Sequence, residues 1–209
     1  MMNCKELLAL CGLLLGIPHA QAITISVSPV LQEVQAGGSL TVLVNAAGVA
    51  AGSAPSIGVY DFDLKYDGSL LAFRDATFGD QLDLFGLGSD TAADGRGPGV
   101  INLFELSFDS VVDLDDRQAD SFTLVSLRFD ILAVGTSGLT LHVNALGDAL
   151  GDPLGANVVN GAVQILSAVP VPGAFGLFAL GALVLGGTSL RWSKEEELDA
   201  SVHGGSRDY

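Results

Sequence analysis

Apolar residues recur at every second position in short runs through the middle of this chain, and this alternation limits the possible folds more than any other feature. The clearest run places apolar side chains at Tyr60, Phe62, Leu64 and Tyr66. Successive side chains of a strand point to opposite faces, so a period of two predicts half-buried β-strands. The same alternation recurs in the runs 24–27, 40–44, 104–108, 127–131, 139–144 and 161–165.

Gly, Asn, Asp and Pro fill the gaps between these runs, as turns require. Seven or more strands without a long helical period predict an all-β fold, an antiparallel β-sandwich over residues 23–166. The apolar positions change from even to odd numbers within 122–127, which predicts a β-bulge near Val125. Residues 86–99 are rich in Gly and Asp and predict a long surface loop, and one helical turn is expected near 110–116.

The N-terminus has the layout of a secretory signal peptide over residues 1–22. Lys5 precedes a short apolar core, Pro18 breaks it, and Ala20 and Ala22 supply the small residues that signal peptidase needs. We expect cleavage after Ala22. The alternative is a lipoprotein signal that uses Cys11, but the preceding leucine fits such a signal poorly and the apolar core would be truncated.

Residues 173–190 hold no charged side chain and predict a transmembrane helix. A helix of that length rises roughly 27 Å, enough for a thin hydrocarbon core. Arg191 and Lys194 follow it as a basic stop, which favours a cytoplasmic tail over 191–209. A buried core helix is the alternative. It is weakened by the linker 167–172 with its prolines and by the basic pair.

The motif Val169, Pro170, Val171, Pro172, followed by an apolar helix and a basic stop, resembles the PEP-CTERM sorting signal in its VPxP-type variants. The resemblance implies processing by an exosortase, and a place in the envelope or extracellular polymer of a Gram-negative bacterium. Val171 stands where that signal usually has Glu, and the chain continues to Tyr209 beyond the basic stop. A plain single-pass anchor in the inner membrane is the alternative.

Two segments of the predicted sandwich resemble cohesin-type domains. The first is 59–67 with 70–73, and the second is 113–124 continued through 127–129, with 145–154 as a hairpin-like connection. The resemblance implies a nine-stranded, jelly-roll-like β-sandwich, related in shape to carbohydrate-binding domains. Cohesins of cellulosomes bind dockerins, which makes a protein ligand one expectation.

Composition narrows the classes of function. Of the 24 acids and nine bases, 18 acids and five bases lie in 23–168, a net charge near −13 that repels nucleic acid and anionic lipid. Both cysteines lie in the leader, so a disulfide in the mature domain is not expected. His142 is the domain's sole histidine and is predicted to face outward, and a Gly-x-Ser-x-Gly nucleophile elbow is absent. We therefore expect no enzyme.

Two kinds of ligand remain as hypotheses. Four carboxylates crowd one turn-like segment and could hold calcium, with a solvated acidic loop as the alternative: Asp113, Asp115, Asp116 and Asp120. No other cofactor is expected. Sugar platforms need exposed aromatic rings, whereas Phe104, Phe108 and the other strand aromatics are predicted to face the core. The sole tryptophan, Trp192, follows the predicted anchor.

Taken together, the sequence predicts an exported, membrane-tethered and exosortase-processed envelope or extracellular-matrix protein with an adhesive or structural role. The alternative is a permanently anchored module that binds polysaccharide or a protein partner. The two hypotheses differ in whether residues beyond Pro172 persist in the mature product.

Overall fold

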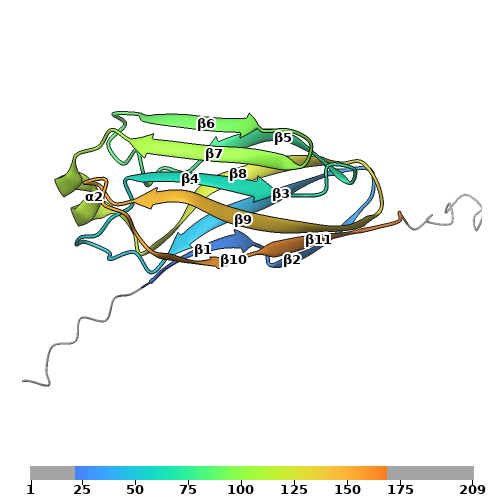
Figure 1. Cartoon of the computed structure of the whole chain (residues 1–209), viewed down its shortest axis with the longest axis horizontal. Helices are drawn as coiled ribbons and strands as arrows, with labels where there is room; N and C mark the ends of the chain where they lie inside the picture. The colour runs from blue at the N-terminus through green and yellow to red at the C-terminus, as the bar shows by residue number, and fades with distance from the viewer. Residues whose placement is uncertain (1–21, 169–209) are drawn as a thin grey trace, which may run out of the picture. The chain divides into compact units, whose positions relative to one another are not determined.

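The structure is a computed structural model that describes residues 22–168. Two β-sheets face each other across one hydrophobic core, and a single short helix, α2 (Val111–Arg117), lies at one end of the sandwich (Figure 1). The predicted leader up to residue 21, the sorting motif 169–172, the helix 173–190 and the basic stop lie outside the described residues. In the segment 22–168, no helix is long and apolar enough to cross a membrane.

One sheet has five strands in the order β10-β1-β3-β8-β5, and the other has six in the order β2-β11-β9-β4-β7-β6. The five-stranded sheet contains β1 (Ile23–Ser28), β3 (Ser39–Ala47), β5 (Leu71–Phe78), β8 (Ser121–Ile131) and β10 (Ala156–Val159). The six-stranded sheet contains β2 (Leu31–Gln35), β4 (Val59–Lys65), β6 (Ser89–Gly95), β7 (Val100–Ser107), β9 (Gly135–Gly147) and β11 (Gly161–Leu166).

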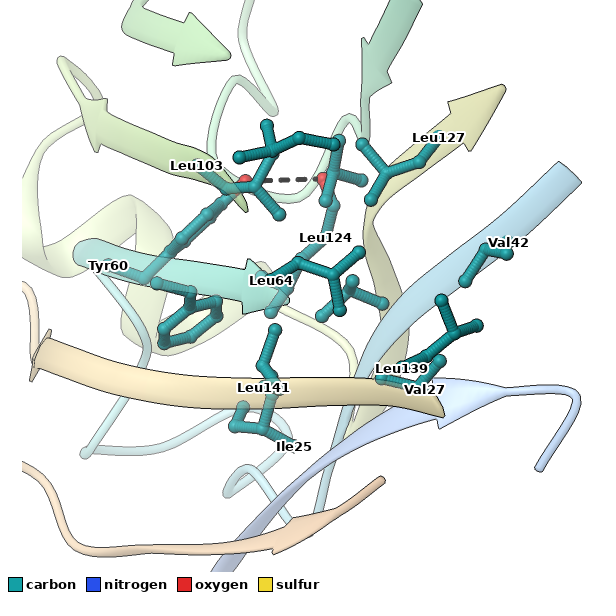
Figure 2. Close-up of a cluster of buried hydrophobic side chains, with 14 of the residues drawn as sticks. Ile25, Val27, Val42, Tyr60, Leu64, Leu103, Leu124, Leu127, Leu139 and Leu141 are labelled. Carbon is teal, nitrogen blue, oxygen red and sulfur yellow. Dashed lines mark hydrogen bonds between the residues drawn. The ribbon is translucent and has the colours of Figure 1, made fainter. Parts of the chain in front are cut away.

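The core forms where the inward faces of the two sheets meet, as the alternation predicts. Figure 2 shows Leu64 of β4 and Leu141 of β9 pointing toward Ile25 of β1 and Leu127 of β8. These side chains are fully buried or nearly so. Both sheets and the core that joins them lie within 22–168, a length that can bury a core of its own. This segment is therefore a folding unit.

The all-β sandwich is confirmed, and so is the single helix over the predicted helical turn. The predicted bulge is confirmed too. Between the pairs Val44–Val125 and Asn45–Thr123 the register of β3 and β8 shifts, so Leu124 is the extra residue. Leu124 and Val125 are both buried as a result. The bulge keeps the apolar side chains on both sides of it directed into the core.

Three predictions need correction. The sandwich is not wholly antiparallel, because β1 pairs with β10 and β2 pairs with β11 in parallel. It has eleven strands where the cohesin resemblance implied nine. Residues 86–99 are not one long loop, because β6 forms within them and pairs with β7 at the sheet edge. Edge strands gain their hydrogen bonds from one neighbour, so a segment of low β-propensity such as β6 can be held there.

The facing of β7 is also the reverse of the prediction. Ile101 and Leu103 are buried, whereas Phe104 is half-buried and Leu106 and Phe108 are exposed. The run 100–108 carries apolar residues at both parities, so its alternation could not fix which face turns inward. This facing buries Glu105. It also leaves an apolar strip of Phe104, Leu106 and Phe108 on the outer side of the six-stranded sheet.

Candidate functional site

The outer face of the six-stranded sheet is the candidate site, and we define it by three rows of residues across β6, β7, β4 and β9. The rows follow from the strand register. The first is Asp90, Leu106, Val59 and Gly147, the second is Ala92, Phe104, Asp61 and Ala145, and the third is Asp94, Asn102, Asp63 and His142. His142 is exposed, as predicted from its place in the alternation.

The third row and Asp61 of the second form a polar cluster centred on Asn102, whose amide Nδ2 donates to Asp61 Oδ1 at 2.6 Å and to Asp63 Oδ1 at 3.0 Å. Arg96 Nη2 donates to Asn102 Oδ1 at 2.8 Å, which closes the cluster on the β6 side. The hydrogen bond from Asn102, helped by the charges of Arg96 and His142, lowers the pKa of Asp63. The cluster therefore presents fixed negative charge along one border of the face.

The first row and the end of β7 form the apolar part of the face. Leu106 is 39% exposed and Phe108, which directly follows β7, is 56% exposed. Phe104 in the second row is half-buried. An aromatic and an aliphatic side chain exposed side by side and bordered by carboxylates are typical of a protein-binding patch.

Beneath this strip, Glu105 is buried at 1% exposure. The Tyr60 hydroxyl donates to Glu105 Oε2 at 3.0 Å, and the Ser89 hydroxyl donates to Oε1 at 2.9 Å. Burial raises the pKa of Glu105, and the nearby charge of Asp83 adds to that rise against the two hydrogen bonds. Burial also raises the pKa of Tyr60, and the Glu105 carboxylate adds to it. The same hydroxyl lies 3.5 Å from the Leu124 carbonyl oxygen. Figure 2 marks this contact with a dashed line.

This pair lies within the core. Glu105 points into the core, and its carboxylate accepts from the hydroxyls of Tyr60 and Ser89 there. The Tyr60 ring packs on Phe62 with ring centroids 4.8 Å apart, so it is held among the core side chains. Tyr60 and Glu105 are better explained as a satisfied polar pair that lets β7 turn its apolar residues outward.

Helix α2 holds the predicted calcium residues, and the structure gives two of them other partners. Asp113 Oδ2 accepts from the Ser110 hydroxyl at 2.6 Å, within the N-cap of the helix. Asp115 Oδ1 accepts from the Ser56 hydroxyl at 2.6 Å and from the Ser56 amide at 3.3 Å. These bonds begin the helix and fasten it to the segment before β4.

The remaining two predicted ligands, Asp116 and Asp120, are exposed. The Asp120 carbonyl accepts from the amides of Gly48 and Val49. Among residues 22–168, no group of three His, Cys, Asp or Glu side chains is placed to hold a metal ion. The four carboxylates are therefore not gathered around one point. Calcium binding stays a prediction that a melting-temperature measurement with millimolar calcium tests.

The outer face of the five-stranded sheet differs in kind. Its outward positions are mainly polar, with Leu43 half-buried among them and Val159 exposed on the edge strand; the polar ones include Thr24, Ser26, Thr41, Ser126 and Arg128. A solvated sheet face has this composition. The contrast between the two outer faces singles out the face of β6, β7, β4 and β9.

Sequence reasoning missed this face because it assigned Phe104 and Phe108 to the core. One signal in the sequence pointed to it. Ile101 and Leu103 have the opposite parity from Phe104 and Leu106, so one of the two sets had to face outward.

No protein-family model matches this chain, and no curated protein matches its sequence. Solved structures do match. The sixth cohesin of scaffoldin B from Acetivibrio cellulolyticus, solved in complex with a dockerin, is 20% identical with a TM-score of 0.56, over 69% of this chain and 99% of that one. The cohesin of a type I cohesin–dockerin complex from Clostridium thermocellum is 17% identical with a TM-score of 0.56, over 69% of this chain and 99% of that one.

A non-cellulosomal cohesin from the archaeon Archaeoglobus fulgidus is 20% identical with a TM-score of 0.54, over 70% of this chain and 92% of that one. Identities this low carry the fold and not the function. Each of the three cohesins is matched over nearly its whole length. The described part of this chain therefore has the fold of cohesin domains.

Proposed function

We propose that this chain is a non-enzymatic binding module that docks a protein partner on the outer face of β6, β7, β4 and β9. The observation that carries the proposal is the exposure of Leu106 and Phe108 beside the fixed polar cluster of Asn102. Protein interfaces combine an apolar centre with a polar, hydrogen-bonding border in this way. The dockerin complexes formed by two of the similar cohesins support a protein as the partner.

The hydrogen bonds around Asn102 make the face suited to binding without rearrangement. Asn102 holds Asp61 and Asp63 at fixed positions, and Arg96 fixes Asn102 in turn. A preformed polar border loses less side-chain entropy on binding than mobile carboxylates would. The acidic surroundings, with Asp90 and Asp94 on the neighbouring edge strand, favour a partner with a basic surface.

Export and tethering belong to the same proposal. The leader 1–22, the VPxP-type motif 169–172 and the apolar segment 173–190 would present the module outside the cytoplasm of a Gram-negative bacterium, at the cell surface or in extracellular polymer. Processing by signal peptidase and an exosortase is part of it. A tethered module that captures a protein partner would serve an adhesive role. Polysaccharide is the competing ligand, and glycan arrays test it.

The experiment is affinity capture with the immobilised domain 22–168 from cells and medium of the producing organism. The test variant carries Leu106→Ser and Phe108→Ser. The matched control carries Leu132→Ser and Val134→Ser, which are similarly exposed at 57% and 54% and lie in the turn between β8 and β9, at the other end of β9 from Gly147. Both variants remove two exposed apolar side chains.

We expect the wild type and the control to retain the same partner and the test variant to lose it by more than tenfold, because truncation of central apolar anchors costs more than about 2 kcal/mol. Equal capture by all three proteins would rule out this face as the docking site. If the wild type binds glycans and the test variant loses that binding, the ligand of this face is a polysaccharide and not a protein.

A further inference from the structure

A cavity of about 210 Å³ opens at the edge of the proposed docking face, where β4 begins and β7 ends. Its walls include Val59, Leu106 and Leu114, together with the turn 148–151 and Asp109. A water molecule takes up about 30 Å³ of liquid, so the space is large enough for one long side chain. Leu106 belongs both to the docking face and to the cavity wall, so a partner bound on the face reaches the cavity.

Local structure keeps this cavity in shape. The Asp148 carboxylate accepts from the amides of Leu150 and Asp152, both at 2.9 Å, and so holds the turn closed. Gly58 lies against that turn, and a Cβ there would be 2.7 Å from the Ala149 Cα. The Gly58 amide donates to the Gly147 carbonyl at 3.0 Å, which links the turn to the start of β4. The turn and the start of β4 are therefore held in place before any ligand arrives.

Asp109 gives the cavity a specific chemistry. The residue is only 9% exposed, and its Oδ2 accepts from the Leu84 amide at 2.7 Å. Its Oδ1 is buried and has no hydrogen-bond partner within residues 22–168. Buried polar atoms are nearly always satisfied, and a carboxylate oxygen is among the costliest to leave without a partner. A donor from another molecule is what this atom lacks.

The donor is not supplied by the bases of the described residues. Across residues 22–168 the ion pairs are Arg74 with Asp130 and Arg96 with Asp63. None reaches Asp109. A cation that enters from outside would bring a positive charge to a strongly acidic domain, and the apolar walls at Val59, Leu106 and Leu114 suit an aliphatic stem.

We propose that this cavity receives a lysine side chain of the protein partner, and that its ammonium group binds Oδ1 of Asp109 after a small shift of the side chains that cover this atom. The choice of lysine follows from the single open oxygen. A guanidinium forms its strongest contact by bridging both carboxylate oxygens, and Oδ2 is already used by Leu84, whereas an ammonium needs one oxygen only. The assignment rests on the proposed function, and it specifies the chemistry of the partner.

The test uses the isotopically labelled domain 22–168, with NMR amide shifts of Gly58, Leu84 and Gly151 as the readout. The probes are N-acetyl-lysine methylamide, the arginine analogue and the uncharged norleucine analogue. We expect saturable shifts at these amides with the lysine probe, with a dissociation constant of about 1–10 mM. The arginine and norleucine probes should bind several-fold more weakly.

Two matched variants complete the design. Asp109→Asn keeps an oxygen acceptor for the Leu84 amide and removes the charge, and we expect it to weaken lysine-probe binding about tenfold. Asp75→Asn makes the same change in charge on the exposed side of β5 in the other sheet, and should bind the probe like the wild type.

Equal binding of norleucine and lysine by the wild-type domain would overturn the inference without reference to any variant. Unchanged binding by a folded Asp109→Asn domain would overturn it as well. So would a full-length chain that excludes the probe while the domain admits it, because the occupant would then be a basic side chain of the same chain outside 22–168, such as Arg191 or Lys194. If the probe fails but Leu106→Ser with Phe108→Ser still abolishes capture, the cavity assignment falls and the docking face stands.

Discussion

Glu105 shows how one residue can decide which face of a strand becomes the binding surface. With Ile101 and Leu103 it forms the inward side of β7, and the hydroxyls of Tyr60 and Ser89 satisfy its carboxylate there. This arrangement turns Phe104 and Leu106 outward. Burial raises the pKa of Glu105, so the charged carboxylate destabilises the folded state. We infer that the fold bears this desolvation cost because the same strand orientation exposes Phe104 and Leu106.

The Glu105→Gln variant should be more stable than the wild type at neutral pH, by about 1 kcal/mol or about 2–4 °C in melting temperature. The amide keeps hydrogen-bonding atoms for Tyr60 and Ser89 and carries no charge to desolvate. Because the pKa is raised in the folded state, the cost of the charge is absent at acidic pH and grows as pH rises through the folded value.

Melting curves from about pH 3 to pH 8 check this prediction, with the expected gain confined to the upper part of the range. Glu33→Gln on β2, whose side chain is exposed, is the control and should change the melting temperature little at any pH. A loss of stability in Glu105→Gln at pH 8 would show that the two hydrogen bonds to the charged carboxylate outweigh its desolvation.

At the scale of elements, α2 is fastened by Gln118, the residue that follows it. Gln118 is buried, its Oε1 accepts from the Ile57 amide at 2.6 Å, and its Nε2 donates to the carbonyls of Ile57 and Gln81 at 2.9 and 3.0 Å. Three backbone groups from two other segments therefore depend on one side chain. The same helix supplies Leu114 to the cavity, so this anchorage also sets one wall of it.

Gln118→Ala should lower the free energy of unfolding by about 1–3 kcal/mol, because it leaves buried backbone groups of Ile57 and Gln81 without partners. Hydrogen exchange should accelerate most at the Ile57 amide and in α2. Asp116→Ala on the exposed side of the helix is the control and should stay within about 0.5 kcal/mol of the wild type. Equal effects of the two substitutions would contradict the role assigned to Gln118.

The elements also show which parts of the fold the sequence could predict. The period of two in β4 and the parity change in β8 are local signals, and both the strand and its bulge could be predicted from them. β6 carries no such signal, because Ser89–Gly95 is rich in Asp, Ala and Gly. Its strand conformation comes from hydrogen bonds with β7, which depend on the sheet as a whole.

For the whole molecule, the sandwich could be predicted, and the docking face could not. The inward direction of β7 depends on which of two apolar sets the opposite sheet covers, and Asp109 becomes a candidate only when the turn 148–151 closes the cavity around it. Both are properties of the packing between segments distant in sequence. The terminal signals, by contrast, are composition patterns that need no tertiary structure to be noticed.

Those signals predict the mature product. Intact-mass measurement of the protein from envelope and medium fractions should find an N-terminus at Ile23, from cleavage after Ala22. If an exosortase acts at the motif 169–172, the surface or secreted pool should lack Tyr209. Retention of Tyr209 in every pool would instead establish the permanently anchored form. That outcome would leave the docking face unaffected, because its residues all lie in 59–147.

Photo-crosslinking in the producing cells tests the central claim most directly. A photoreactive phenylalanine analogue would replace either Phe108 on the docking face or Arg128 on the exposed outer side of the five-stranded sheet. We predict that the Phe108 position yields one discrete crosslinked protein and that the Arg128 position yields none. A crosslinked protein from Arg128 with none from Phe108 would contradict the account, and so would the same products from both positions.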